Sequence, residues 1–286
     1  MKRILITGKD SYIGTSVEKW LLKSPEKYQV YTLDVKGEEW KNHDFSRYDV
    51  VFHVAGIAHI KETKKNKDLY YKVNRDLAYE VAVKSKESKI KQFIFLSSMS
   101  VYGLDEGVIN KQTKPNPKSA YGKSKFEAEN LISNLKDQIL KIVILRPPIV
   151  YGKNCKGNYK LLEKIAKSMP IFPDIKNERS MIFIDNLSEL IKLIIDNESN
   201  GLFLPQNKDY VNTSEMVKMI SESYNIPIKM TTAFNSILNF FGDIPKIKKA
   251  FGSLVYDISL SEYINEYSLI DMRTSVILSR QDGNKS

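Results

Sequence analysis

The chain has 286 residues, a formal net charge of +10 and one cysteine, Cys155, which excludes an internal disulfide framework or a cysteine-based metal site. No apolar stretch approaches the roughly 20 residues of a membrane-spanning helix, and the N-terminus enters a strand directly, so we expect a cytoplasmic protein with no membrane partner and no metal. The lysines are scattered without interleaved aromatic residues, which favours a solvated basic surface over a nucleic-acid partner.

The first predicted elements are a strand, a glycine turn and a helix. MKRILIT at 1–7 is a short run of branched apolar residues, and 16–22 has the periodicity of an amphipathic helix. A helix N-terminus presents free N–H groups and a partial positive charge, and glycines let a pyrophosphate approach the backbone. The loop TGKDSYIG at 7–14 therefore indicates a phosphate-binding turn, with an ordinary strand-to-helix turn as the alternative.

A second strand is predicted over 29–33, and it ends in Asp34. An acidic residue about twenty positions beyond a glycine loop accepts hydrogen bonds from ribose hydroxyls and repels a 2′-phosphate. Asp34 therefore favours NAD over NADP, and the alternative is an exposed loop aspartate.

The next stretch, HDFSRYDVVFHVAGIAH, contains an apolar strand over 49–54. Parallel crossovers normally take a dozen or more residues, yet only five separate Asp44 from Val50. We therefore predict a truncated third strand with no helix between it and the fourth. His53 is interpreted as a core residue, whereas His59 lies nearer the expected ligand crevice. A helix over 69–85 then carries Asn74.

The residues with catalytic potential lie between 93 and 125. QFIFLSS reads as a buried strand with Ser98 at its carboxyl end, where open parallel sheets bind ligands. Tyr121 and Lys125 follow one helical turn apart. A tyrosine of ordinary pKa is a poor base at neutral pH, and a neighbouring ammonium group lowers that pKa. The arrangement predicts a tyrosine that exchanges protons.

The series TGKDSYIG, SSMSVYG and YGKSK resembles the extended short-chain dehydrogenase/reductase superfamily, in particular its nucleotide-sugar epimerase/dehydratase branch. The resemblance implies an α/β fold, with a Rossmann-like doubly wound parallel sheet over 1–150 as the NAD-binding domain. A smaller C-terminal substrate-binding lobe occupies most of 151–286, with a flexible tail from about 275. One departure is Ser11, which replaces the middle glycine of the family loop and either donates to a phosphate or weakens the site.

The resemblance also implies roles for individual residues. Tyr121 takes a proton from a sugar hydroxyl while hydride leaves the same carbon for the nicotinamide, Ser98 holds the oxygen, and Lys125 holds ribose hydroxyls. The implied NAD-binding set is Gly8, Ser11, Tyr12, Ile13, Gly14, Asp34, Asp44, Phe45, Ala55, Gly56, Asn74, Tyr121, Lys125 and Pro148; the implied UDP-sugar set is Ser98, Ser100, Asn158, Arg179 and Tyr256.

Met99 and Ser100 stand where 4,6-dehydratases of this branch carry an Asp-Glu pair, so dehydration is excluded. Three functions stay open at this point. The first is a 4-epimerase of the UDP-glucose or UDP-N-acetylglucosamine type in surface-polysaccharide synthesis, which Asp34 favours. The second is a UDP-4-keto-6-deoxy-sugar reductase, which the short chain favours; the third is a non-catalytic, dinucleotide-sensing scaffold, which Ser11 favours. The family also suggests a possible homodimer through the helix that bears Tyr121.

Overall fold

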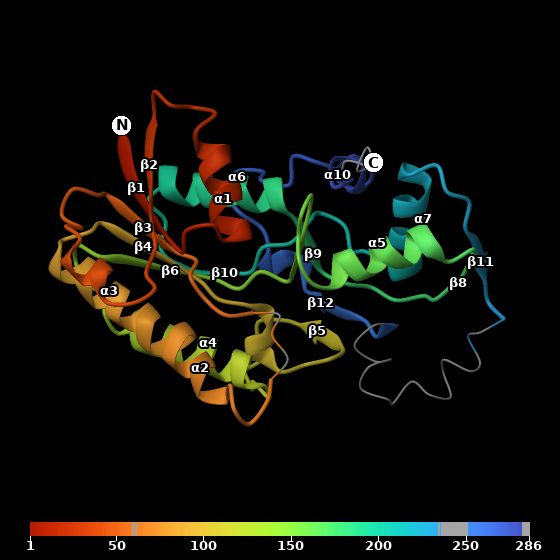
Figure 1. Cartoon of the computed structure of the whole chain (residues 1–286), viewed down its shortest axis with the longest axis horizontal. Coiled ribbons are helices and arrows are strands. Elements are labelled where there is room, and N and C mark those ends of the chain that lie inside the picture. Colours follow the sequence, from red (N-terminus) through yellow and green to blue (C-terminus); the bar gives the residue numbers. More distant parts are fainter. Residues whose placement is uncertain (59, 61, 234, 236–250, 282–286) are drawn as a thin grey trace.

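Six parallel strands form the centre of the part of the chain that the computed structural model describes, namely residues 1–58, 60, 62–233, 235 and 251–281 (Figure 1). The sheet order is β10-β6-β4-β3-β1-β2. This order reverses direction between β1 and β3, which is the topology of a doubly wound fold, and it confirms the predicted fold class. The strands are β1 (Lys2–Thr7), β2 (Tyr28–Leu33), β3 (Val50–His53), β4 (Gln92–Leu96), β6 (Lys141–Leu145) and β10 (Gly201–Phe203).

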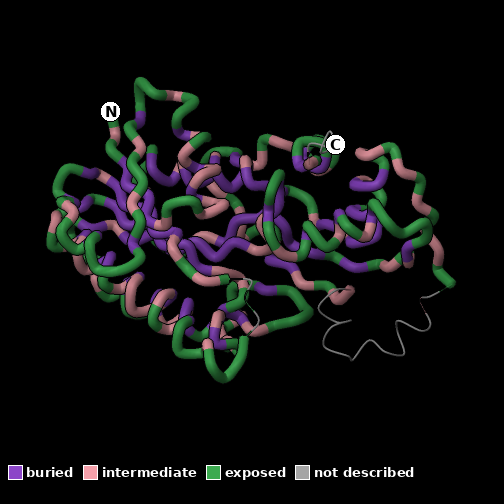
Figure 2. Tube along the Cα trace, in the orientation of Figure 1, coloured by how far each residue is buried: buried purple, intermediate pink, exposed green. Residues whose placement is uncertain are grey.

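Both faces of the sheet are buried, as expected for parallel strands. Ile4 and Ile6 point into one apolar cluster while Leu5 points into the other, and β3, β4 and β6 alternate in the same way. Helices α1 (Tyr12–Leu21) and α6 (Ile184–Asp196) cover the first face. Helices α3 (Leu77–Glu87) and α4 (Ala120–Ser133) cover the second. Figure 2 shows the buried sheet running through the middle of these layers.

The segment between β2 and β3 differs from the prediction. Among the described residues no strand forms there; the chain makes a 3-10 turn over Glu39–Asn42 and then an irregular stretch. Trp40 and Phe45 are both buried against the second face of the sheet. These aromatic side chains close the end of the core that a third strand would have covered, and β2 is left as the edge strand.

The smaller lobe contains three two-stranded sheets, counted over the described residues. Its boundary is not a single cut at residue 150, because β5 lies in the first half of the chain and pairs with β12, while α6 and β10 return to the layers of the large sheet. The strand pairs are β5 (Gly107–Ile109) with β12 (Leu254–Tyr256), β7 (Ile149–Tyr151) with β9 (Met181–Phe183), and β8 (Ile171–Pro173) with β11 (Lys229–Thr231), and the helices are α5 (Asn158–Ser168) and α7 (Thr213–Ser223).

The described C-terminal residues pack onto this lobe. After a 3-10 turn over Ile258–Leu260, helix α10 spans Met272–Leu278. Ser275 and Ser279 are fully buried, and the Ser275 hydroxyl lies 2.6 Å from that of Tyr151. The expected flexible tail from about 275 is therefore wrong as far as residue 281, because these small polar side chains bond inside the lobe. None of the helices in the described ranges is long and apolar enough to cross a membrane.

His53 is a core residue, as the sequence predicts, and His59 lies outside the described residues. The His53 ring is fully buried between those of Phe93 and Phe95, and its Nδ1 lies 2.8 Å from the Thr7 hydroxyl oxygen. Burial, with a smaller contribution from the charge of Lys125, lowers the pKa of His53 to about 3.

We expect this histidine to make the protein acid-sensitive. Between pH 6.5, the ordinary pKa of histidine, and about 3, His53 is protonated in the unfolded state and neutral in the folded state. The free energy of unfolding therefore falls as the pH falls through this window, by about 1.4 kcal/mol per pH unit from this group. Urea unfolding of the wild type and His53→Leu from pH 7 to 4 isolates the effect from that of the carboxylates. Parallel pH dependences in the two proteins would contradict it.

Candidate active site

Five neighbouring strands deliver polar or small residues to one edge of the sheet. Gly8 follows β1, Asp34 follows β2, Gly56 follows β3, Ser98 follows β4 and Pro148 follows β6. Because carboxyl ends of parallel strands share an edge, these residues border the crevice where the strand order reverses. This edge is where open α/β sheets bind ligands.

Gly8 lets the glycine loop pack closely against the chain that follows β3. Gly8 has φ +113°, and a Cβ placed on it would lie 2.7 Å from the backbone nitrogen of Ala55. Ser11 is the N-cap of α1 with φ −71°, and its Oγ accepts a hydrogen bond from the Gly14 N–H at 3.2 Å. A serine is therefore accommodated without strain, and its hydroxyl caps the helix. Apart from that of Gly14, the N–H groups of the first helical turn have no intrahelical partner and can bind an anion.

Tyr12 contributes to this loop through its backbone, since its side chain turns toward the smaller lobe. A Cβ on Gly152 would lie 2.7 Å from the Tyr12 hydroxyl oxygen. That hydroxyl is buried without a hydrogen-bond partner among the described residues, and burial raises its pKa strongly. Ile13 packs against both the sheet and the lobe. The pair thus joins the loop to the smaller lobe.

Two exposed carboxylates, Asp34 and Asp44, belong to the predicted NAD-binding set. Asp34 accepts a hydrogen bond from the Lys36 N–H at 2.9 Å, and Asp44 accepts one from the Ser46 N–H at 2.9 Å. Both side chains keep oxygen atoms for further donors, and a hydrogen bond from Ser46 lowers the pKa of Asp44. Phe45 is fully buried in the core, so only its backbone can face a ligand.

Ser98 and Tyr121 meet at the centre of the edge. Ser98 is the N-cap of a 3-10 turn, η3 (Met99–Tyr102), where its Oγ accepts from the Ser100 N–H at 3.1 Å and lies 3.2 Å from the Ser100 hydroxyl. Burial raises the pKa of Tyr121, and a hydrogen bond with Ser98 opposes that rise. The structure thus places the predicted proton-exchanging tyrosine and the predicted oxygen-holding serine near each other.

Lys125 lies beneath this pair. It is 4% exposed, its Nζ donates to the carbonyl oxygen of Leu96 at 2.8 Å, and it sits 4.6 Å from the Phe95 ring centroid. Burial lowers its pKa to about 7. The expectation that Lys125, together with the positive nicotinamide ring of NAD, lowers the pKa of Tyr121 stays a prediction. Burial destabilises both charges, and the pKa of Tyr121 lies above its ordinary value.

Asn74 braces the loop after β3. It is fully buried within a π-helical turn over Lys72–Asp76, between α2 (Lys67–Tyr71) and α3. Its Oδ1 accepts from the Ile57 N–H at 2.7 Å, and its Nδ2 donates to Ser124 on the catalytic helix at 3.3 Å. A Cβ on Gly56 would lie 3.0 Å from Asn74 Oδ1 and 3.2 Å from Lys125 Nζ. Asn74 therefore joins the loop after β3 to α4 and is not a surface residue.

The residues predicted to bind the sugar nucleotide are dispersed. Asn158 is exposed in the first turn of α5, and Ser100 is exposed beside Ser98. Arg179 is 8% exposed, and its backbone bridges to Val211 and Leu254. Tyr256 is not brought to the crevice: it is fully buried, and its hydroxyl donates to the Arg146 carbonyl oxygen at 2.8 Å.

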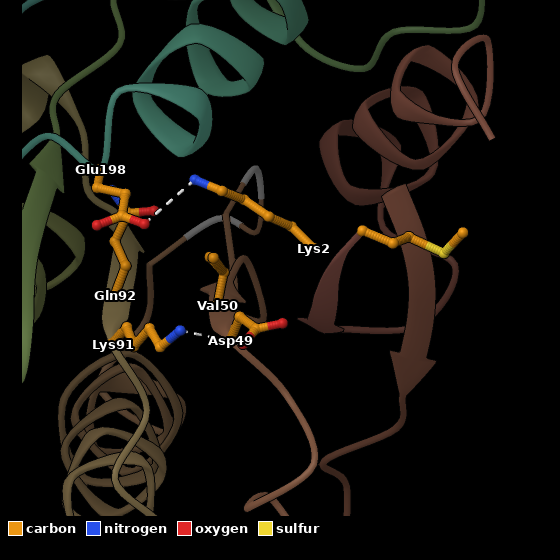
Figure 3. A pocket seen from close by; sticks show the side chains of 7 residues that line it. Lys2, Asp49, Val50, Lys91, Gln92 and Glu198 are labelled. Atoms are coloured by element: carbon orange, nitrogen blue, oxygen red, sulfur yellow. Dashed lines mark ion pairs between the residues drawn. The ribbon is translucent and has the colours of Figure 1, made fainter. Parts of the chain in front are cut away.

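A hollow lies at the opposite edge of the sheet. This cavity of about 150 Å³ is bordered by the amino ends of β1, β3 and β4. Figure 3 shows that its charges pair with one another, Lys2 with Glu198 at 3.5 Å and Lys91 with Asp49 at 3.7 Å. It holds none of the predicted site residues. Over the described part of the chain, no group of three or more His, Cys, Asp or Glu could hold a metal ion.

Comparisons with known proteins point to one family. The family model of the NAD dependent epimerase/dehydratase family matches residues 4–203. A UDP-glucose 4-epimerase from Vibrio cholerae is 32% identical over 90% of this chain and 88% of its own length. An N-acetyl-alpha-D-glucosaminyl-diphospho-ditrans,octacis-undecaprenol 4-epimerase from Escherichia coli O157:H7 is 26% identical over 78% of this chain and 72% of its own.

Among solved structures, a UDP-glucuronic acid 4-epimerase from Bacillus cereus in complex with NAD superimposes with a TM-score of 0.77. The match covers 97% of this chain and 94% of that one at 20% sequence identity, so it bears on the fold. The fold includes both the large sheet and the smaller lobe.

Proposed function

This chain belongs to the NAD dependent epimerase/dehydratase family, and we propose that within it the chain is a UDP-sugar 4-epimerase of the UDP-glucose or UDP-N-acetylglucosamine type. The observation that carries the proposal is the placement of Tyr121, Ser98 and the buried Lys125 at the carboxyl end of β4, where Ser98 lies near enough to Tyr121 to affect its pKa. Met99 and Ser100 lack the acidic groups of a dehydratase. We place the reaction in surface-polysaccharide synthesis.

In this proposal, the residues at the carboxyl edge of the sheet have separate roles in the reaction. NAD, when bound, supplies a reversible hydride acceptor, and the capped N-terminus of α1, Asp34 and Lys125 are the groups that would hold it. Ser98 holds the oxygen on carbon 4 of the sugar through its hydroxyl. Tyr121 removes the proton from that oxygen and returns it in the reverse direction, a step that general acid–base catalysis accelerates. Asn158 and Arg179 hold the diphosphate in this proposal.

The other two functions have weaker support. A non-catalytic scaffold was favoured by Ser11, but this serine fits its position as a helix cap and leaves the loop geometry intact. The reductase uses the same Ser98, Tyr121 and Lys125, so it differs from the epimerase in whether the cofactor stays bound between turnovers.

Product analysis tests the proposal. Purified protein is incubated with UDP-glucose and with UDP-N-acetylglucosamine, and nuclear magnetic resonance detects the product inverted at carbon 4 without added cofactor. The cofactor released on denaturation is identified in parallel. An epimerase retains NAD and inverts carbon 4. No inversion of either sugar, with consumption of added NADH by a 4-keto-6-deoxy sugar, would replace the epimerase with the reductase.

Asp34 is expected to make the protein prefer NAD. Its exposed carboxylate would meet a ribose hydroxyl and repel a 2′-phosphate. We expect NAD(H) to bind at least about tenfold more tightly than NADP(H), which corresponds to about 1.4 kcal/mol. Titration of both cofactors into the wild type and Asp34→Ser measures the ratio of the two affinities, and this ratio should be smaller in the variant. Equal affinities in the wild type would remove Asp34 from the cofactor site.

A further inference from the structure

A buried ion pair lies directly behind the catalytic helix residues. Glu129, on α4 one turn after Lys125, is 3% exposed and Arg146, at the end of β6, is 7% exposed. The Glu129 carboxylate accepts from Arg146 Nη2 at 2.6 Å and from its Nε at 3.0 Å. It also accepts a hydrogen bond from the hydroxyl of Ser97. Arg146 in turn donates to the Tyr102 hydroxyl at 2.9 Å.

This pair joins the three elements that carry the site. Glu129 belongs to the helix of Tyr121 and Lys125, Ser97 adjoins Ser98, and Arg146 lies two residues before Pro148 of the predicted NAD-binding set. A buried ion pair is a poor way to stabilise a fold, because desolvation of the two charges cancels most of their attraction. The cost of this arrangement therefore suggests a role in the site.

The negative charge of Glu129 acts on Lys125. The electrostatic partners of Lys125 are Glu129, one turn after it on the same helix, and His53 on β3, while Tyr121 lies one turn before it on that helix. His53 is neutral near pH 7, since its pKa is about 3. Glu129 is thus the negative charge beside Lys125, and it raises the pKa that burial lowers.

We propose that Glu129 is a positioning residue of the reaction, which keeps Lys125 charged beside Tyr121 and anchors Ser97 so that Ser98 stays in place. The catalytic part of this inference rests on the proposed function; the electrostatic part concerns the protein itself. The Glu129 carboxylate accepts hydrogen bonds from Arg146 and Ser97, and it influences Tyr121 and Ser98 only through other residues. It acts through Lys125 and Ser97, with Arg146 fixing its orientation.

The test measures Lys125 directly. The full chain, saturated with NAD, is labelled with 13C at lysine Cε, and the Lys125 signal is assigned by its loss in Lys125→Met. Glu129→Gln keeps the shape and removes the charge, and we expect the pKa of Lys125 to fall by about one unit or more. Turnover at pH 7 should fall on the order of fivefold as the charged fraction of Lys125 falls. The descending limb of the pH–rate profile should move to lower pH.

Two further variants keep the result interpretable. Glu129→Gln/Arg146→Met removes both charges, so no guanidinium is left unpaired in the core. The pKa of Lys125 in this double variant should lie between its values in the wild type and in Glu129→Gln. Glu163→Gln makes the same change at a buried glutamate of α5, which accepts from the Tyr224 hydroxyl, and should leave Lys125 unchanged. An unchanged Lys125 pKa in both Glu129 variants overturns the proposal. A shifted pKa in a protein that turns over neither UDP-sugar overturns the proposed function alone.

Discussion

Replacing Tyr121 with phenylalanine is expected to lower turnover by about a hundredfold or more, because the substitution removes the only group on the ring that can exchange a proton. The aromatic ring itself remains, so its packing against Tyr70, at 6.3 Å between ring centroids, should persist. Cofactor binding should survive for the same reason. Steady-state kinetics on the sugar that the wild type inverts, together with a titration of NAD, measures both quantities.

Tyr28→Phe is the matched control for this variant. The Tyr28 hydroxyl donates to Asp196 at 2.6 Å, and Tyr28 begins β2, at the far edge of the sheet from the crevice. Loss of the Tyr28 hydroxyl should lower the free energy of unfolding and leave turnover unchanged. If Tyr121→Phe retained near-normal activity while its folding matched that of the wild type, proton exchange by Tyr121 would be disproved.

The local parts of this fold were predictable from the sequence. The buried strands β1 and β4 and the edge strand β2 are short runs of branched and aromatic residues, and β1 is followed by Gly8, whose φ of +113° favours glycine. Tyr121 and Lys125 lie on one helix at a spacing of four, so their proximity needs no tertiary information. Asn74 is a site residue only by the family resemblance, because the sequence pattern alone does not show that its side chain is buried in a π-helical turn.

The parts that depend on long-range contacts were not predictable. The pairing of β5 with β12 joins segments far apart in the chain, and each strand is only three residues long. Trp40 and Phe45 replace the expected third strand because two aromatic side chains cover the core end that the short crossover leaves open. Tyr256 carries a motif resemblance, yet its ring is enclosed in the core.

Glu129 was missed, although the sequence contained a signal for it. Lys125, Ala128, Glu129 and Ile132 follow the spacing of one helical face, and all four are buried. Two opposite charges, four residues apart on an otherwise apolar face, indicate a helix whose inner side holds a polar network. The identity of the third partner, Arg146, requires the fold, because it comes from β6.

Removing the guanidinium of Arg179 is expected to weaken substrate binding by roughly ten- to hundredfold. The proposed contact with the diphosphate is made equally in the ground and transition states, so the Michaelis constant should rise and the turnover number should change less. A charge-assisted hydrogen bond contributes about 1.5–3 kcal/mol, which gives that range. UDP alone should lose affinity by a similar factor in Arg179→Ala, because it keeps the diphosphate and lacks the sugar.

NAD binding serves as the internal control, since Arg179 is bridged to Val211 and Leu254 in the smaller lobe and the dinucleotide crevice lies at the edge of the large sheet. Arg179→Lys keeps the charge and loses the planar fork, so its affinity for UDP should fall between the wild type and Arg179→Ala. Arg273→Ala, at an exposed arginine of α10, should leave UDP affinity unchanged. Calorimetric titration of UDP and NAD into all three variants separates the outcomes. If UDP affinity is unchanged in Arg179→Ala, or if only NAD affinity is lost, this arginine does not hold the diphosphate.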